Sequence, residues 1–364
     1  MREASSSRTV TDTDSYAFFF YKPIKRQRED DRGTPKIIMK RLALLILFAV
    51  SVMAVTAQSS TQMATLCHDG EISTFYNANA LKEAYSAAVD GDVITLSSGS
   101  FASVNLNTKK VTLRGAGMED GPNRTMIIGS LLLTVLPTEE NADIPMIIEG
   151  IYFHGVLSLE SIFELTMIKC GFSEVSVRSA STLRNCTFLH CMLNKGNIDF
   201  EDAIISFKNC YFGDVFLGGS AGSTYNLDHC TVNFSKEGEG RRFRYCNMSD
   251  CLIFGPLLGN FERDAAGCVY VGDYYLDPFE DCSSATNRVY PVGTKFLKEG
   301  SRYYELTDEK AAEWIGIDGT QVGMHGGSMP FDPTTSNPRI TRFDVSSKTT
   351  SDGRLAVDIE VQTY

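Results

Sequence analysis

The chain has 364 residues, of which 43% are hydrophobic and 22% are charged, a composition typical of a folded globular protein. Its formal net charge is −11 at pH 7. Nucleic acids and other polyanions require a basic surface, so the charge argues against nucleic acid as a partner.

The sequence pattern of the first 57 residues predicts an N-terminal leader. Residues 1–38 are polar, of mixed charge and without apolar periodicity, so we expect them to be disordered or to precede the true start at Met39. Residues 39–57 contain a basic flank, an apolar run of about 14 residues and the small-residue site Val55-Thr-Ala57, an order that predicts a signal peptide. The run is shorter than the ~20 residues that span a bilayer.

We therefore expect an exported protein, whether periplasmic, secreted or on the cell surface, with no integral membrane domain in the mature chain. The alternative is retention by an uncleaved N-terminal apolar helix. The leader holds 10 of the 34 basic and 6 of the 45 acidic residues, so cleavage would leave a net charge of −15.

The sequence of residues 58–90 predicts an N-terminal cap on the repeats that follow, made of a hairpin and a short amphipathic helix. In the helix, Leu81, Ala84, Tyr85 and Ala88 share one face. We expect this face to cover the open first coil of the repeats that follow, which would protect an unpaired sheet edge.

A short pattern occurs six times between residues 148 and 253. Each copy has an apolar residue, two mostly polar residues, a small residue that is usually Cys, a variable residue and a second apolar one. The period of about 20 residues is shorter than the ~33 to 47 of common helical repeats and fits coils of β-strand. Residues 91–331 are therefore predicted to form a right-handed parallel β-helix, an all-β solenoid, with an irregular closing segment. The copies are Ile148-Glu-Gly-Ile-Tyr-Phe153, Met167-Ile-Lys-Cys-Gly-Phe172, Leu183-Arg-Asn-Cys-Thr-Phe188, Phe207-Lys-Asn-Cys-Tyr-Phe212, Leu227-Asp-His-Cys-Thr-Val232 and Met248-Ser-Asp-Cys-Leu-Ile253.

The position before the Cys predicts one turn per coil, because Gly, Asn and Asp tolerate positive φ. Lys169 and His229 are exceptions to this composition. The position holds Gly150, Lys169, Asn185, Asn209, His229 and Asp250.

The cysteines that follow the turns are predicted to face the core as a reduced ladder. Stacked coils hold equivalent side chains parallel, whereas a disulfide needs a Cβ–S–S–Cβ torsion of ~90°, so bridges between neighbouring coils are disfavoured. Cys268 and Cys282 lie outside this pattern, and a bridge between them stays open. The ladder consists of Cys170, Cys186, Cys210, Cys230 and Cys251.

Two segments carry a resemblance to a known group. Residues 79–101, with an amphipathic helix, Gly91-Asp92, a strand and a Gly turn, resemble the first segment of pectin-lyase-like β-helices. Tyr303-Tyr-Glu-Leu306 and Gly316-Ile-Asp-Gly-Thr-Gln-Val-Gly-Met-His-Gly-Gly-Ser-Met-Pro-Phe331 are similar to the closing segment of secreted β-helix proteins of Gram-negative bacteria, many of them uncharacterised. The resemblance covers roughly residues 64–331 and implies the fold. Because the group includes lyases, hydrolases and proteins with no known activity, it does not specify a function.

Asp228 and His229 are the candidates for catalysis. Asp228-His229-Cys230 resembles the Asp-His-Cys tract of one pectate lyase family. That family also uses Ca²⁺-binding acidic residues and an Arg-x-Pro-x-x-Arg tract, and this sequence lacks the Arg tract. Since His229 occupies a predicted turn position, we interpret it as structural.

The segment from Gly272 to Asp281 contains four carboxylates among aromatic residues. Ca²⁺ takes oxygen ligands of this kind, although the spacing matches no loop motif, and no other cofactor is expected. The candidate ligands are Asp273, Asp277, Glu280 and Asp281, and the candidate sugar-binding aromatics are Tyr270, Tyr274 and Tyr275.

Residues 332–364 predict a linker and a C-terminal β-hairpin that turns at Ser351-Asp-Gly353. Two hypotheses for function remain. The favoured one is an exported, non-catalytic β-helix that presents a long acidic face to a glycan or another cell-surface component. The alternative is a polysaccharide lyase or glycoside hydrolase that acts on an acidic polysaccharide.

Overall fold

The computed structural model describes most of the chain after the leader. The predicted leader and signal peptide, residues 1–57, lie outside the described residues. The described residues are 62–134, 138, 140–177, 182–200, 202–234, 243–257, 264–274, 277–282 and 284–335, together with the strands 339–349 and 355–362.

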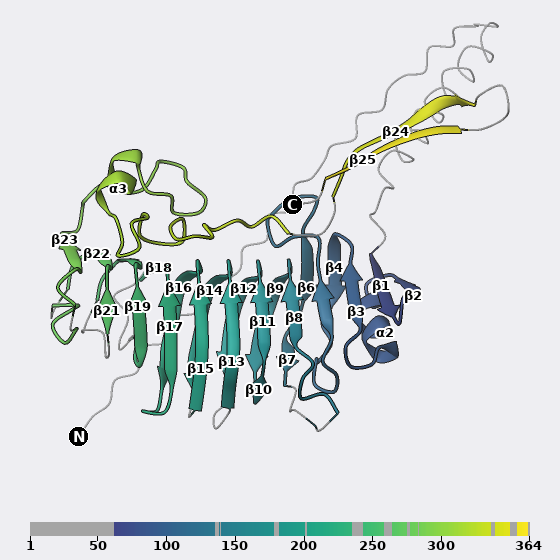
Figure 1. The fold of residues 1–364 in the computed structure, drawn as a ribbon. Coiled ribbons are helices and arrows are strands. Elements are labelled where there is room, and N and C mark those ends of the chain that lie inside the picture. Colours follow the sequence, from purple (N-terminus) through teal and green to yellow (C-terminus); the bar gives the residue numbers. More distant parts are fainter. Residues whose placement is uncertain are drawn as a thin grey trace, which may run out of the picture. The chain divides into compact units, whose positions relative to one another are not determined.

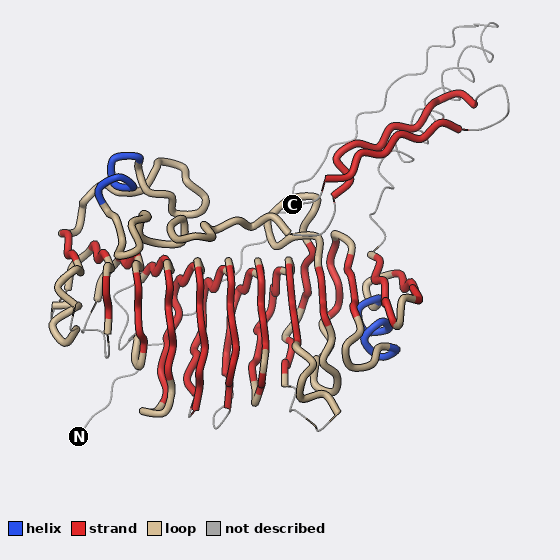
Figure 2. The backbone as a smooth tube through the Cα atoms, in the orientation of Figure 1, coloured by secondary structure: helices blue, strands red, loops and turns tan. Residues whose placement is uncertain are grey.

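The fold is an all-β parallel solenoid of about nine coils, as the repeats predicted, and two sheets run along its length (Figures 1 and 2). The chain passes from one sheet to the other in each coil, and strands of successive coils pair in parallel. The parallel strands of the first sheet are β3 (Val93–Leu96), β5 (Thr112–Arg114), β8 (Met146–Glu149), β11 (Leu165–Ile168), β13 (Thr182–Leu189), β15 (Asp202–Lys208), β17 (Thr224–Asp228), β19 (Cys246–Ser249) and β21 (Ala265–Ala266), with β10 (Ile162–Phe163) beside β13. Those of the second are β4 (Gly99–Ala102), β6 (Thr125–Ile128), β9 (Tyr152–Leu159), β12 (Gly171–Val177), β14 (Met192–Phe200), β16 (Tyr211–Gly219), β18 (Thr231–Asn233), β20 (Leu252–Phe254), β22 (Val269–Val271) and β23 (Arg288–Tyr290), with β7 (Leu131–Leu133) beside β9.

A hairpin and a helix precede the first coil. Strands β1 (Met63–His68) and β2 (Glu71–Tyr76) pair antiparallel, and β1 also pairs antiparallel with β3, so the hairpin extends the first sheet. Helix α2 (Ala80–Ala87) packs against these strands, and the apolar face expected from the sequence, from Leu81 to Ala88, is buried.

Apolar side chains from both sheets fill the solenoid. They stack from coil to coil, because equivalent positions of successive coils lie one above the other. The rings of Phe153 and Phe172 stack with centroids 5.3 Å apart, and those of Phe188 and Phe207 with centroids 4.9 Å apart. These rings are at most 2% exposed, so the core is continuous from coil to coil.

The turn between the two sheets is a row of positive-φ residues, here called the turn column. Their φ angles lie between 48° and 68°, the left-handed region that the sequence predicted for this position. The column consists of Gly150, Lys169, His190, Asn209, His229, Asp250 and Gly267.

The coil that contains β13 and β14 turns five residues later than predicted. Its turn is at His190, and the inward thiol after the turn belongs to Cys191. Asn185 also has a positive φ of 56°, but it lies within β13 beside an irregularity in the pairing with β15, and Cys186 is buried in the same strand. The placement of Asn185 and Cys186 in the turn and ladder was therefore wrong. Two overlapping frames satisfy the six-residue pattern, and only the strand pairing separates them.

A seventh copy of the repeat follows the six that were predicted. Gly267 supplies its turn, and Cys268 and Tyr270 are fully buried in the equivalent inward positions. Cys268 thus belongs to the ladder, and all ten cysteines are free thiols. Each ladder thiol donates to a backbone carbonyl, as Cys210 Sγ does to the carbonyl of Phe188 at 3.3 Å.

The segment after the last coil has its own small core. Helix α3 (Asp308–Glu313) is followed by Trp314, which is fully buried and packs on Tyr290 and Phe296 with ring centroids 4.8 and 5.7 Å away. The single tryptophan is therefore a core residue. Further along, β24 (Arg339–Thr349) and β25 (Leu355–Gln362) pair antiparallel with each other, and the predicted turn at Ser351-Asp-Gly353 lies outside the described residues.

Candidate functional site

Residues 316–335, here called the strap, run back along the solenoid beside the turn column (Figure 1). The strap runs opposite to the order of the coils. Its first residues contact the last coils, and its last residues contact earlier coils. Side chains of the column make these contacts, although the turn itself needs only their backbone. Polar contacts join Asp250 to Ile317, His229 to Thr320, Asn209 to Met324 and Gly326, His190 to Met329, and Lys169 to Asp332 and Thr334.

Contacts between the strap and the solenoid continue past residue 331, the predicted end of the β-helix segment. Residues 332–364 were expected to begin with a linker, but Thr335 is fully buried, and its hydroxyl donates to the carbonyl of Ala116 at 3.2 Å. The solenoid-bound part of the chain therefore extends at least to residue 335.

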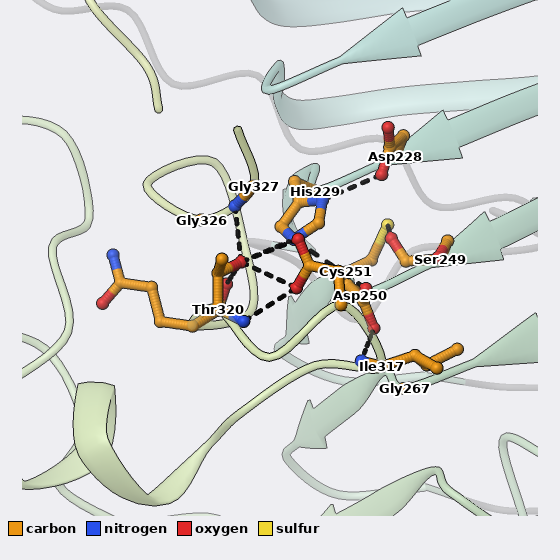
Figure 3. Close-up of polar contacts among 12 residues, drawn as sticks. Asp228, His229, Ser249, Asp250, Cys251, Gly267, Ile317, Thr320, Gly326 and Gly327 are labelled. Atoms are coloured by element: carbon orange, nitrogen blue, oxygen red, sulfur yellow. Dashed lines mark hydrogen bonds and ion pairs between the residues drawn. The ribbon is translucent and has the colours of Figure 1, made fainter. Parts of the chain in front are cut away.

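His229 lies at the centre of a polar cluster between the turn column and the strap (Figure 3). Its Nδ1 lies 2.8 Å from Asp228 Oδ1, and its Nε2 lies 3.1 Å from the hydroxyl oxygen of Thr320. The same Nε2 is 3.4 Å from Asp318 Oδ2 and 3.8 Å from Asp250 Oδ2. The imidazole side chain is only 4% exposed.

The two carboxylates near Nε2 are held by backbone groups of the strap. Asp250 Oδ1 accepts a hydrogen bond from the backbone N–H of Ile317 at 2.7 Å, and the Asp250 side chain is 2% exposed. Asp318 Oδ1 accepts from the backbone N–H and from the hydroxyl of Thr320, both at 2.8 Å. In each carboxylate the second oxygen is the one that faces His229.

Glycines of the strap allow this close approach. A Cβ on Gly326 would lie 2.6 Å from His229 Cδ2, and one on Gly316 would lie 2.5 Å from the carboxylate carbon of Asp250. Gly327 also lies against the imidazole, since a Cβ there would be 3.1 Å from Nδ1, and it donates its N–H to the Thr320 hydroxyl at 2.6 Å. The glycine-rich sequence after residue 315 is therefore a surface fitted to the turn column.

The cluster is strongly acidic around a single imidazole. Burial alone lowers the pKa of His229, but the hydrogen bond to Asp228 and the negative charges of Asp228, Asp318 and Asp250 outweigh it, so this pKa is raised. The hydrogen bond to His229 in turn lowers the pKa of Asp228. Burial opposes ionisation of Asp318, yet hydrogen bonds from Thr320 hold its pKa below the ordinary value.

This geometry limits what Asp228 and His229 can do as a catalytic pair. A general base must lie within hydrogen-bonding reach of a substrate proton. Here one ring nitrogen faces Asp228, and the other faces the strap, which covers the ring. The φ of His229 is 48°, as the turn interpretation required, but its ring has a second role that the turn does not explain, which is to hold the strap.

The predicted aromatic candidates do not form one surface. Tyr270 is fully buried, with its hydroxyl donating to the carbonyls of Gly255 and Asp273, so its prediction as an exposed sugar platform was wrong. Tyr274 is 47% exposed and meets the Tyr270 ring edge-on. Tyr275 lies outside the described residues.

The four acidic residues of the segment after Gly272 are exposed. These candidate Ca²⁺ ligands belong to no described group of three or more His, Cys, Asp or Glu side chains whose ligand atoms lie within 4.8 Å of one another. The structure instead brings together His229, Asp250 and Asp318 in that way. The four candidates are Asp273, Asp277, Glu280 and Asp281.

A cleft of about 170 Å³ lies between the second sheet and the closing segment. Arg124 stacks on the ring of Tyr152, with the guanidinium carbon 3.6 Å from the ring centroid. Tyr303 donates its hydroxyl to Glu119, whose carboxylate also lies 3.7 Å from Arg302. The cleft is lined by Met118, Glu119, Asp120, Arg124, Tyr152, Gly171, Met192, Asn194, Arg302 and Tyr303.

Sequence reasoning missed the residues that the strap contributes, above all Asp318 and Thr320. Two signals in the sequence were available. Lys169 and His229 break the small-residue composition of the turn position, which implies that their side chains contact something. The glycines from Gly316 to Gly327 imply close approach to another surface, but the sequence does not identify that surface.

Comparisons of the chain with known protein families, with curated proteins and with solved structures returned no match. The class that the structure defines is thus the parallel β-solenoid, here with a strap bound along its turn column. In the part of the chain that the structure describes, no helix has the length and apolar character needed to cross a membrane.

Proposed function

We propose that this chain is an exported, non-catalytic β-helix that binds a neutral glycan in the cleft beside Tyr152. The single observation that carries the proposal is the lining of the cleft, where aromatic rings, an amide and paired charges lie together. Such a mixture suits sugars, because a ring face can pack on CH groups while amide and charged groups bond to hydroxyls. The signal-peptide pattern and the resemblance to pectin-lyase-like β-helices support export.

The charges in the cleft favour a neutral ligand. Glu119 and Asp120 lie opposite Arg124 and Arg302, so the local charges balance. The chain as a whole is acidic, which disfavours long polyanions. A volume of about 170 Å³ is below the ~300 to 1,000 Å³ of pockets that enclose a drug-sized ligand, so we propose that the cleft holds one sugar unit of a longer glycan.

The test is a binding and cleavage screen of the purified chain against neutral and acidic polysaccharides. We expect saturable binding of a neutral glycan with no change in its length. Asn194→Ala and Arg302→Ala should each weaken binding about tenfold, the effect of losing ~1.4 kcal/mol. Asn247→Ala is the control, because its amide lies on the first sheet and contacts Asn226 at 3.1 Å. Equal affinity of the cleft variants and wild type would contradict the site.

A polysaccharide lyase or glycoside hydrolase is the second candidate, and the 2.8 Å contact between Asp228 and His229 is the observation that favours it. The burial of the imidazole supports the non-catalytic proposal over this one. Incubation with pectic substrates and Ca²⁺, followed by absorbance of unsaturated products, tests it. We expect no product, and turnover that His229→Asn abolishes would establish the lyase.

A further inference from the structure

The orientation of the His229 ring leaves Nε2 facing oxygen atoms of Thr320, Asp318 and Asp250. Asp228 Oδ1 lies 2.8 Å from Nδ1 of His229, and a carboxylate can only accept a hydrogen bond, so the proton at this contact belongs to Nδ1. A neutral imidazole then presents a lone pair at Nε2. The hydroxyl of Thr320 lies 3.1 Å from this nitrogen, but its one proton has a nearer acceptor in Asp318 Oδ1 at 2.8 Å. The other atoms near the lone pair are Asp318 Oδ2 at 3.4 Å and Asp250 Oδ2 at 3.8 Å, which are themselves electron-rich. Either a proton or a metal ion at Nε2 removes this conflict.

The charge balance favours a divalent ion over a proton. Three carboxylates, those of Asp228, Asp250 and Asp318, surround the one imidazole. Among the described residues, the ammonium group that forms an ion pair with one of them is Lys208 Nζ, 4.0 Å from Asp228. A protonated His229 would therefore leave the pair Asp250 and Asp318 only half neutralised. Asp250 is 2% exposed, and a buried carboxylate whose charge is not fully compensated is unfavourable.

Asp250 gives a second, independent indication of a ligand. Its Oδ1 accepts a hydrogen bond from Ile317, whereas its Oδ2 accepts no hydrogen bond from any described residue and is directed into the cluster. In a carboxylate side chain that is only 2% exposed, an oxygen that accepts no hydrogen bond is best compensated by a cation in front of it.

The distances suit one small metal ion. The three ligand atoms lie within 4.8 Å of one another. For a zinc ion at ~2.1 Å from each ligand, the separations of 3.4 and 3.8 Å from Nε2 correspond to ligand angles of about 110° and about 130°, the first tetrahedral and the second wider. The contact between Asp228 and Nδ1 is the carboxylate partner that metal-bound histidines usually have, and it fixes the ring.

We propose that a divalent transition-metal ion of the zinc type binds His229 Nε2, Asp250 Oδ2 and Asp318 Oδ2 and fastens the strap to the solenoid. His229 and Asp250 belong to the turn column and Asp318 belongs to the strap, so the ion joins the two. An imidazole ligand and a small ligand set favour zinc over calcium, which prefers six to eight oxygens. The proposal is independent of glycan binding.

The first experiment measures zinc binding to the full-length chain after treatment with a chelator. We expect saturable binding of one Zn²⁺ per chain by calorimetry. Thermal unfolding should shift upward by about 4 °C at a hundredfold excess over Kd, because the ion binds only the folded, strapped state. A midpoint that responds to pH but not to zinc or chelator would mean that a proton alone occupies the site, and would overturn the proposal.

Variants locate the ion. Asp318→Asn removes a ligand charge at a side chain that is 38% exposed, and should weaken Zn²⁺ binding by tenfold or more and remove the thermal shift. Asp228→Asn should weaken binding less, through loss of ring orientation. Asp332→Asn is the matched control, since it loosens the strap at Lys169 and should lower the midpoint while the response to zinc remains.

Substitution with Co²⁺ separates this site from the free cysteines. Nitrogen and oxygen ligands give weak visible bands without a thiolate charge-transfer band. A thiolate band, or unchanged zinc affinity in Asp318→Asn, would place the metal elsewhere and overturn the assignment.

Discussion

Lys169 and Asp332 are 163 residues apart in the sequence, yet Lys169 Nζ lies 3.2 Å from Asp332 Oδ2 across the boundary between the turn column and the strap. The ammonium group also donates to the carbonyl of Thr334. The lysine side chain is 15% exposed, so this contact is better protected than an ordinary surface ion pair.

Replacing Lys169 by Met should therefore lower the free energy of unfolding by about 1 to 2 kcal/mol, since hydrogen bonds to charged groups contribute ~1.5 to 3 kcal/mol. The control is Lys195→Met, which removes the exposed ion pair with Glu174 and should cost less than ~1 kcal/mol. Urea denaturation measures both. Equal costs for the two variants would show that the strap contact contributes no more than a surface pair.

The glycine at residue 326 offers a test of how closely the strap fits. A Cβ there would clash with the carbonyl of Gln321 and lie 2.6 Å from the His229 ring, so Gly326→Ala should destabilise by more than about 3 kcal/mol. Gly319→Ala meets no atom within 4 Å but has a φ of +84°, and should cost only the ~1 to 2 kcal/mol of left-handed backbone. Equilibrium unfolding of both variants is the measurement, and the reverse order would contradict the fit.

Acid should weaken the contact of His190 with the strap. Burial lowers the pKa of this histidine, and its Nε2 lies 3.0 Å from the carbonyl of Met329 while its Nδ1 is buried without a partner. The unfolded chain, with a pKa near ~6.5, therefore binds a proton more readily than the folded one. The contribution of neutral His190 is complete above that pH and is lost as the pH falls below it, towards the folded pKa.

His190→Asn should lack this acid-dependent loss, because Asn209 already fills the same type of position and donates to strap carbonyls. The free energy of unfolding is to be measured for both proteins from pH 8 to pH 5. Below about pH 6.5, that of the wild type should fall relative to that of the variant. Parallel pH profiles would disprove the assignment.

The thiol ladder should resist labelling in the native state. Cys210 is fully buried, and burial raises the pKa of its thiol, so little reactive thiolate forms. Cys67 and Cys282 are partly exposed and should react first. Cys210→Ser should destabilise by about 1 to 3 kcal/mol, because a more polar group enters the core, and Cys210→Ala should cost less. Rapid native-state labelling of Cys210 would contradict this packing.

The repeated part of the fold was predictable because each coil repeats the same local requirement. A positive-φ residue followed by an inward thiol marks a turn wherever it occurs, as at Asn209 and Cys210. The same rule, applied once more, finds Gly267, Cys268 and Tyr270, and it would have corrected the prediction that Tyr270 is exposed.

The strap was not predictable from local pattern. Its contacts join residues 67 to 219 positions apart, and no repeat relates the two partners. Asp318 has no distinguishing neighbour in the sequence. Its significance follows only from the fold, which places it 3.4 Å from His229.

The direction of the strap determines how the molecule should yield to force. A solenoid couples each coil only to its neighbours, so its last coil can fray alone. Here a pull applied beyond residue 335 would reach the contact of Thr335 with Ala116 first, then that of Lys169, and that of Asp250 last, and would open the contacts one at a time. Pulling in a single-molecule instrument should accordingly release the strap in several small, low-force steps before any coil unfolds.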